Sequence, residues 1–404
     1  MNKHLFLGDE AIAQGALDAG LSGVYAYPGT PSTEITEYIQ ISPEAKNNTI
    51  HTRWCTNEKT AMEAALGMSY IGKRALVCMK HVGMNVAADA FINAGMTGVN
   101  GGLIVVAADD PSMHSSQNEQ DSRFYGNFAF VPMFEPSNQQ EAYDMMAAGF
   151  GLSEKFKIPV LLRITTRLAH SRAGVTTTLK IKDQNEISFP DNTGQFILLP
   201  ANSRRRFRTL LNDFTEASEN SSFNRYIDGP NKKMGIIACG IAYNYLMENY
   251  PEGCDYPVVK LSQYPLPLKM LQKLFDTCDE ILVLEDGYAF VEEKIKGIIP
   301  SKIIKGKLDG TLNRDGELNP DRVAKALGLK SGAEFEIPNI VAMRPPALCQ
   351  GCGHRDMYEA LNNVAKTYKN ARIFSDIGCY TLGALPPFRA IHSCVDMGAS
   401  ITMA

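Results

Sequence analysis

Short apolar runs alternate with longer segments in which apolar residues recur three and four positions apart. The runs indicate buried strands, and the longer spacing is that of one face of a helix. The predicted strands are residues 23–27, 50–53, 74–80, 103–108 and 159–164, and the predicted helices are residues 8–19, 57–67, 84–95 and 139–153. This alternation predicts one doubly wound α/β domain over residues 1–172.

Three more apolar runs lie further along the chain, at residues 234–240, 256–261 and 280–285. They predict a second, smaller α/β domain over residues 231–335, for which we expect a structural or assembly role because few catalytic residue types cluster there. Residues 173–230 are predicted to form a linker arm, since the tract 180–193 is polar.

A third unit is predicted over residues 344–404. It contains a helix at residues 356–366, a strand at 371–375 and at most one more strand at 391–394. One or two strands do not make a stable sheet. We therefore expect this domain to be truncated, so that either the natural chain continues or another chain completes it.

Composition narrows the class of protein. A chain of 404 residues is longer than one domain with a single core usually is. Its composition, 45% apolar and 21% charged residues, is typical of a soluble globular protein. A net charge of -4 gives no reason to expect nucleic acid as a partner. The nine cysteines are odd in number and scattered, and no apolar run suggests a leader or a membrane span. These features predict a protein of the reducing cytoplasm that is not bound to a membrane.

Polar residues follow the predicted strands of the first domain. The turn at residues 28–34 can offer backbone N–H groups and the hydroxyls of Thr30 and Ser32 to an anion, although Ser32 or Thr33 would otherwise simply cap the next helix. Glu58 lies in the first turn of an alanine-rich helix, where the helix dipole favours a negative charge. The helix behind Glu58 is expected to be buried, which makes Glu58 a candidate site residue; the alternative is that Glu58 is only a surface charge. The polar segment 115–123 is expected to be a functional loop.

Two cysteine-containing patches organise the third unit. Cys349 and Cys352 form a Cys-x-x-Cys pair, which indicates metal, cluster or redox chemistry in a chain that is not secreted. The predicted strand 371–375 ends at Asp376, Gly378 and Cys379. Ligands bind at the carboxyl ends of strands in open α/β sheets, so we expect both patches to face one site.

Six segments in this order carry a resemblance that covers the whole chain: YPGTPSTEI, NEKTAMEAALG, MKHVGMNVAAD, SSQNEQDSR, RPPALCQGCGHR and SDIGCYTLGALPP. Together they are similar to the large subunits of indolepyruvate ferredoxin oxidoreductases, within the thiamine-diphosphate-dependent 2-oxoacid:ferredoxin oxidoreductases. The resemblance implies a thiamine-diphosphate-binding fold, with a pyrimidine-binding domain, a transketolase C-terminal-like domain and the start of a diphosphate-binding domain. It also implies a homodimer core within a hetero-oligomer that includes a small beta subunit.

The implied reaction is oxidative decarboxylation of aryl 2-oxoacids such as indolepyruvate and phenylpyruvate. The acyl group passes to coenzyme A, and electrons pass through [4Fe-4S] clusters to ferredoxin. The family's Mg2+ motif would come just past Ala404, and the domain with most of the clusters is absent, so this chain is expected to be inactive alone. A non-oxidative thiamine decarboxylase and a fragment that acts only in assembly remain alternatives.

The resemblance also implies site residues. Glu58, with Gly67 nine positions on, matches the catalytic glutamate that hydrogen-bonds the aminopyrimidine ring, and Thr30, Ser32 and His81 match the substrate side. The other residues implied at the cofactor are Gly29, Gly353, His354, Asp376, Gly378, Cys379 and Gly383. Cys349, Cys352 and Cys379 are candidate cluster ligands, with Cys394 a weak candidate for the fourth. The alternatives are that the cysteines only line the site and that His81 and His354 are only packing residues.

Overall fold

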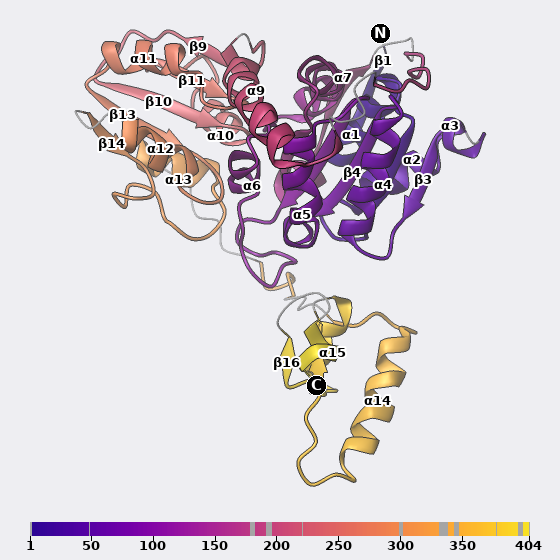
Figure 1. Cartoon of the computed structure of the whole chain (residues 1–404). Coiled ribbons are helices and arrows are strands. Elements are labelled where there is room, and N and C mark those ends of the chain that lie inside the picture. The colour runs from indigo at the N-terminus through magenta and orange to yellow at the C-terminus, as the bar shows by residue number, and fades with distance from the viewer. Residues whose placement is uncertain are drawn as a thin grey trace. The chain divides into compact units, whose positions relative to one another are not determined.

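The structure is a computed structural model that describes residues 2–47, 49–177, 182–190, 196–219, 221–298, 302–330, 338–342, 347–376, 378–394 and 399–403. The chain divides into two compact units, residues 1–332 and residues 333–404, each of which is drawn in Figure 1. Among the described residues, no helix is both long and apolar enough to cross a membrane.

A seven-stranded sheet forms the first half of the larger unit. Its strand order is β12 (Gln263–Tyr264), β6 (Met133–Phe134), β7 (Val160–Thr165), β5 (Leu103–Asp109), β4 (Ala75–Lys80), β2 (Gly23–Ala26) and β3 (His51–Trp54). All neighbours are parallel except β12, which is antiparallel to β6. The five predicted strands of this domain are confirmed. Their apolar runs arise because parallel strands are buried on both faces.

Helices cover both faces of this sheet, as the doubly wound prediction requires. One core contains α1 (Gly8–Asp18), α2 (Thr33–Gln40), α7 (Gln139–Phe156) and α8 (Thr166–His170). The opposite core contains α4 (Glu58–Tyr70) and α5 (His81–Thr97), with α6 (Arg123–Phe128) packed beside them. A short helix, α3 (Pro43–Lys46), follows α2. The predicted helices are confirmed, and α5 begins three residues earlier than expected.

The segment predicted as a linker arm has more structure than expected. Its strand β8 (Arg172–Thr177) pairs antiparallel with β1 (Asn2–Leu7), which the sequence analysis missed. Its helix α9 (Pro200–Glu219) packs Leu210 and Ala217 into a small core of its own. Residues 182–190 are mostly exposed, as predicted, yet the Ser188 N–H donates to the carbonyl of Ile71 at 2.9 Å.

A five-stranded sheet forms the other half of the larger unit. Its order is β14 (Ile303–Lys305), β13 (Glu280–Leu284), β10 (Met234–Cys239), β11 (Val258–Leu261) and β9 (Arg225–Ile227), with only β9 antiparallel. The helices of this half are α10 (Ala242–Asn249), α11 (Leu268–Thr277), α12 (Phe290–Ile298) and α13 (Pro320–Ala326). The three predicted strands are confirmed, and the two edge strands were missed. The domain boundaries themselves stay a prediction.

Two buried arginines join the two sheets. Arg163 of β7 donates to Asp109 Oδ2 at 2.6 Å, to Glu135 Oε1 at 2.5 Å and to the carbonyl of Asp286, just past β13, at 2.9 Å. Arg123 of α6 donates to Glu285 Oε2 at 2.9 Å in the same way. The arginines therefore fasten the second sheet to the first through bonds that water does not reach.

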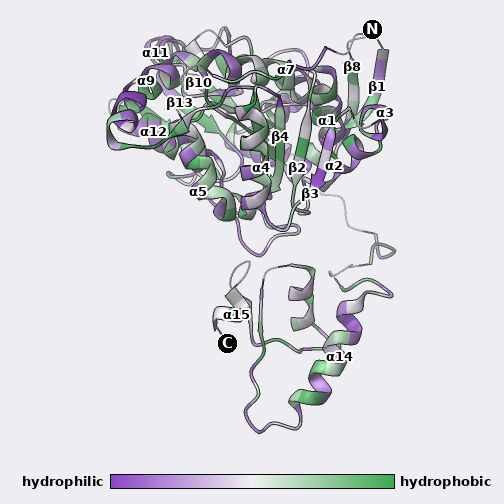
Figure 2. Cartoon of the chain, turned by 45° about the vertical axis from the view of Figure 1, so that its right-hand side comes forward, coloured by the Kyte–Doolittle hydropathy of each residue, from purple (hydrophilic) through white to green (hydrophobic). Residues whose placement is uncertain are grey.

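The smaller unit has a sparse core. Helix α14 (Gly353–Ala365) precedes β15 (Phe374–Ser375), a 3-10 turn (Cys379–Ala384), β16 (Ser393–Cys394) and α15 (Ala399–Met403). The two strands are parallel, and the predicted helix and strand pair are confirmed. Hydrophilic and hydrophobic residues alternate along α14 in Figure 2, and Tyr358 is its one buried residue.

Candidate functional site

The predicted site residues of the larger unit gather at one edge of the seven-stranded sheet. Strands β5, β4, β2 and β3 are consecutive neighbours and run parallel, so their carboxyl ends meet at the same edge. The turn at residues 27–32 follows β2, Glu58 begins the helix after β3, and His81 follows β4 directly. Ligands in open α/β sheets bind at this edge.

The turn after β2 is closed by its own side chains. The Ser32 hydroxyl donates to the Gly29 carbonyl at 2.8 Å, and the Gly29 N–H donates to Thr33 Oγ1 at 3.0 Å. Ser32 occupies the N-cap position of α2, but its side chain makes no capping bond, so the capping hypothesis is wrong for Ser32. Thr30 lies exposed at the tip of the turn.

A close packing contact holds this turn against β4. A Cβ atom at Gly29 would lie 3.1 Å from the Cβ of Lys80, which is tighter than an ordinary side-chain contact. Lys80 Nζ in turn donates to the carbonyl of Ser115 at 2.7 Å. The turn after β2, the end of β4 and the loop after β5 therefore form one connected surface.

Glu58 is a buried carboxylate with a spare oxygen. Its helix is capped by Asn57, whose side chain accepts the Thr60 N–H at 2.9 Å, and Glu58 itself is only 4% exposed. Within the described part of the chain, Oε2 has no hydrogen-bond partner. Burial raises the pKa of Glu58, and a bond from its own backbone N–H offsets this only in part. The alternative that Glu58 is a surface charge is wrong.

Gly83 of α5 makes room beside this carboxylate. A Cβ atom at Gly83 would lie 2.7 Å from Oε1 and from Cγ of Glu58, so any larger side chain would push Glu58 from its place. A carboxylate held there can accept a hydrogen bond from a ring N–H of a ligand. The residues present therefore fit the aminopyrimidine ring of thiamine diphosphate.

His81 is 1% exposed at the start of α5. Its Nε2 lies 3.2 Å from the carbonyl oxygen of Asn118, which can only accept, so this nitrogen carries the proton. Among the described residues, Nδ1 is buried without a hydrogen-bond partner. In the neutral ring Nδ1 is an acceptor, available to a ligand at the edge of the sheet.

The loop predicted to be functional serves mainly to hold the site in place. Near its start, Asp110 Oδ2 accepts bonds from the Ser115 N–H at 2.8 Å and from the Ser116 hydroxyl at 2.6 Å. At its end, Asp121 pairs with Arg123, and Asn118 in its middle orients His81. The ends of this loop thus have structural contacts, and the functional role predicted for residues 115–123 stays a prediction.

The two cysteine patches of the smaller unit lie beside each other. Cys352 Sγ lies 3.4 Å from His354 Nδ1, and the His354 ring meets the Tyr380 ring edge-on with centroids 5.6 Å apart. The Tyr358 hydroxyl donates to the Tyr380 carbonyl at 2.5 Å. Cys349 is exposed and Cys352 is half-buried. Helix α14 and the 3-10 turn thus bring the two patches onto one surface.

The other predicted site residues of this unit differ in their contacts. Asp376 Oδ1 accepts the Ser400 N–H at 2.6 Å, and Cys394 Sγ donates to the Asp376 carbonyl at 3.3 Å. A Cβ atom at Gly383 would lie 2.3 Å from the Tyr358 ring, which gives that glycine a packing reason. Cys379 is exposed. The roles predicted for Gly353, Gly378 and the cysteines stay predictions.

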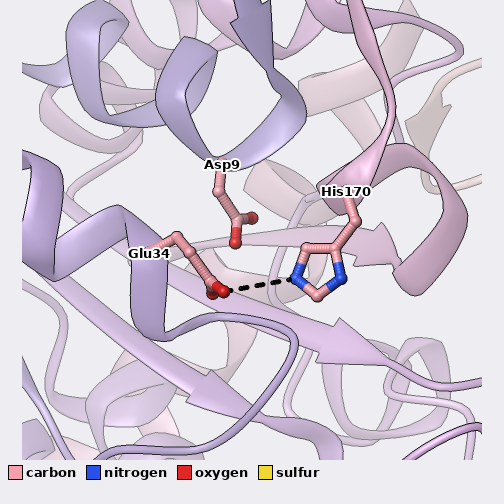
Figure 3. A group of neighbouring side chains, drawn as sticks. All are labelled: Asp9, Glu34 and His170. Carbon is pink, nitrogen blue, oxygen red and sulfur yellow. Dashed lines mark ion pairs between the residues drawn. The ribbon is translucent and has the colours of Figure 1, made fainter.

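The sequence analysis missed one cluster at the same edge, over the opposite face of the sheet. Asp9, Glu34 and His170 each present a ligand atom, and these atoms lie within 4.8 Å of one another (Figure 3). The three residues come from α1, α2 and α8 and are far apart in sequence, so no local spacing could have indicated them.

A separate cavity of about 520 Å³ lies between α6, β12 and α12. Apolar side chains such as Met133, Leu266 and Phe290 line it, and its lining residues include none of the predicted site residues. This cavity and the predicted site residues therefore lie in different places on the described chain.

Comparison with known proteins supports the family resemblance. A family model described as pyruvate flavodoxin/ferredoxin oxidoreductase, thiamine diphosphate-binding, matches residues 14–188. The indolepyruvate oxidoreductase subunit IorA of Archaeoglobus fulgidus is 39% identical over 99% of this chain and 67% of its own length. The chain belongs to the IorA family. The IorA subunit of Pyrococcus abyssi is 41% identical over 99% of this IorA-family chain and 65% of its own length.

A solved structure confirms the predicted thiamine-diphosphate-binding fold class. It is a 2-oxoglutarate:ferredoxin oxidoreductase from Magnetococcus marinus, 16% identical, with a TM-score of 0.64 over 81% of this IorA-family chain and 65% of that chain. At this identity the likeness establishes the fold alone. The IorA-family chain spans about two thirds of the length of the relatives it matches.

Proposed function

We propose that this IorA-family chain provides the thiamine-diphosphate-binding part of an enzyme that oxidatively decarboxylates aryl 2-oxoacids. Indolepyruvate and phenylpyruvate are its proposed substrates, and aryl-acetyl-CoA, CO2 and reduced ferredoxin are its products. The names of the relatives, indolepyruvate oxidoreductase subunits, support the substrate class. The complete enzyme would include a homodimer core, a small beta subunit, Mg2+ and [4Fe-4S] clusters.

The observation that carries this proposal is the buried, unpartnered Oε2 of Glu58 among the described residues, with Gly83 leaving room beside it. Bound thiamine diphosphate supplies the nucleophilic carbon and the electron sink for loss of CO2. Glu58 accepts a hydrogen bond from the pyrimidine ring nitrogen at Oε2. Burial raises the pKa of this carboxyl group, which suits a group that shares a proton with a ring nitrogen.

The substrate binds between the turn after β2 and the start of α5. Thr30, exposed at the tip of the turn, donates its hydroxyl to the substrate carboxylate. Ser32 donates to Gly29, so its role is to shape the turn. His81 contributes Nδ1 as an acceptor, oriented by the bond from Nε2 to Asn118. Gly29 keeps the turn against β4.

The smaller unit contributes the diphosphate side and the electron relay in this proposal. His354, Asp376, Gly353, Gly378 and Gly383 approach the cofactor. Cys349, Cys352 and Cys379 are proposed ligands of a cluster, with all nine cysteines of the chain free. We assign no residue of this chain to Mg2+.

The test is anaerobic turnover of indolepyruvate with coenzyme A and a viologen dye by the natural complex that contains the full-length chain. Glu58→Gln should lower kcat by about 10²–10⁴-fold, the range for loss of a general acid or base. Glu63→Gln is the matched control, because Glu63 lies exposed on the same helix and pairs only loosely with Lys59 at 3.9 Å.

The outcomes separate the alternatives. Equal activity of the wild type and Glu58→Gln would overturn the role of Glu58. Release of an aldehyde without reduction of the dye would establish a non-oxidative decarboxylase. If the wild type neither turns over nor binds thiamine diphosphate with Mg2+ in calorimetry, the chain acts only in assembly.

A further inference from the structure

Three helix ends meet at the cluster of Asp9, Glu34 and His170. Asp9 lies in the first turn of α1, Glu34 in the first turn of α2, and His170 is the last residue of α8. Glu34 Oε1 lies 3.7 Å from His170 Nε2, and Figure 3 shows the carboxyl group of Asp9 turned toward both. The three side chains therefore converge on a common point from three separate elements.

Asp9 is the buried anchor of this cluster. It is 0% exposed, and within the described residues neither of its oxygens has a hydrogen-bond partner. Glu34 Oε2 is likewise buried and unpartnered in the described chain. An unpaired buried carboxylate such as that of Asp9 is costly, and a second carboxylate beside it adds repulsion. Such a pair must either share a proton or hold a cation.

The charges around the pair favour a cation. The carboxylate oxygens of Asp9 and Glu34 lie within 4.8 Å of each other, and Glu10 adds a third acidic group in the first turn of α1. The nearby Arg172 forms an ion pair with Glu10 at 3.2 Å, so its charge already has a partner outside the cluster. The N-termini of α1 and α2 each contribute only about half a positive charge. Negative charge therefore remains in excess at the point where the three side chains meet.

A close backbone contact builds the cluster into the fold. A Cβ atom at Gly8 would lie 2.3 Å from the carbonyl oxygen of Leu168, so only glycine lets α1 begin directly against α8. That approach places Asp9, the next residue, opposite His170. The outer side is open, because the side chains of His170 and Glu34 are 35% and 38% exposed. The cluster thus has a fixed inner ligand and a route for entry from solvent.

We propose that Asp9, Glu34 and His170 bind one divalent transition-metal ion of the Mn2+ or Zn2+ class. Two carboxylate oxygens and an imidazole nitrogen are a ligand set that suits these ions better than Mg2+ or Ca2+, which prefer oxygen alone. Solvent would fill the remaining positions. The ion is separate from the Mg2+ of a thiamine site, because no diphosphate takes part. It fastens the start of α2, directly after the turn with Thr30, to α1 and α8.

The experiment is equilibrium dialysis of the natural complex against Mn2+ after treatment with a chelator, followed by metal analysis. Thiamine diphosphate is left out, and Mn2+ is chosen because the cysteine thiols prefer softer metals. Asp9→Asn should bind about one Mn2+ fewer per chain than the wild type. His170→Gln should weaken binding by at least about tenfold, as loss of a ligand does more than loss of an outer partner. His4→Gln, an exposed histidine, is the matched control and should change nothing.

Thermal unfolding shows whether each variant is folded, so that lost metal binding is not mistaken for misfolding. Without metal, Asp9→Asn should melt at or above the wild-type temperature, because it removes a buried unpaired charge. Added Mn2+ should raise the melting temperature of the wild type and of His4→Gln but not of Asp9→Asn. If the wild type and Asp9→Asn bind the same amount of Mn2+, the two carboxyl groups share a proton and the proposal is wrong.

Discussion

Two regions of this chain hold buried carboxylates that differ in what surrounds them. Between the two sheets, Asp121 pairs with Arg123 at 2.5 Å and Glu135 pairs with Arg163 at 2.5 Å. At the carboxyl edge of the seven-stranded sheet, Glu58 keeps an oxygen without a partner in the described residues. The first kind of carboxylate is satisfied by the fold itself, and the second kind is not.

The pKa values of Asp121 and Glu58 show this contrast. Burial alone would raise the pKa of Asp121, but Arg123 and Arg163 outweigh it and hold this pKa well below its usual range. Burial raises the pKa of Glu58 with no arginine to oppose it. A buried acid with a raised pKa in a cleft is a functional candidate, while a paired one is structural. The distinguishing feature is a charged partner: Asp109 also keeps a spare oxygen, but Arg163 binds its other oxygen, whereas no arginine opposes the effect of burial on Glu58.

The largest expected effect comes from breaking the paired region. Arg163→Met leaves Asp109 and Glu135 buried without their cation, and loss of one partner from a buried ion pair costs about 3–5 kcal/mol of unfolding free energy. Urea-induced unfolding measures it. The control is Arg172→Met, whose exposed pair with Glu10 should be worth at most about 1 kcal/mol. Equal midpoints for the two variants would show that the network does not fasten the sheets.

A smaller effect is expected where α1 meets α8. Gly8→Ala places a methyl group 2.3 Å from the rigid carbonyl of Leu168, and overpacking of this kind costs about 1–3 kcal/mol. Gly151→Ala in α7 is the matched control. Among the described residues, nothing lies within 4 Å of its added methyl group, so it should stabilise the helix by about 0.5–1 kcal/mol. Chemical unfolding of both variants should give opposite signs, and a gain for Gly8→Ala would contradict the close contact.

The sequence predicted the central strands well because burial on both faces demands continuous apolar runs such as residues 103–108. It missed β9 and β14, which are three residues long and lie at the edges of their sheet, where one side is partly exposed. It also missed β1 and β8, whose six-residue ribbon contains polar positions. An arginine inside an apolar strand, at position 163, was the available signal for the buried ion network.

The residues of the candidate site also differ in whether the sequence could predict that they lie together. Thr30, Glu58 and His81 each follow a predicted strand, so strand order alone could place them at one edge. Asp9 and His170 belong to the ends of helices brought together by tertiary packing, and no periodicity or spacing links residues 161 positions apart in the chain, the difference of their two numbers. Sequence patterns report local structure, whereas a cluster of this kind is a property of the assembled fold.

The smallest expected effect is on the free energy of unfolding of Glu58→Gln, measured without cofactor. The folded-state pKa of Glu58 lies above its ordinary value of 4.5, so its charged form is penalised on folding. This penalty is absent below about pH 4 and grows as pH rises through the folded-state pKa. Glu58→Gln should therefore be more stable than the wild type by about 1 kcal/mol at pH 7 and equal to it at about pH 4, while Glu63→Gln follows the wild type. A destabilised Glu58→Gln at pH 7 would mean that the fold already satisfies this carboxylate, which would move Glu58 into the structural class.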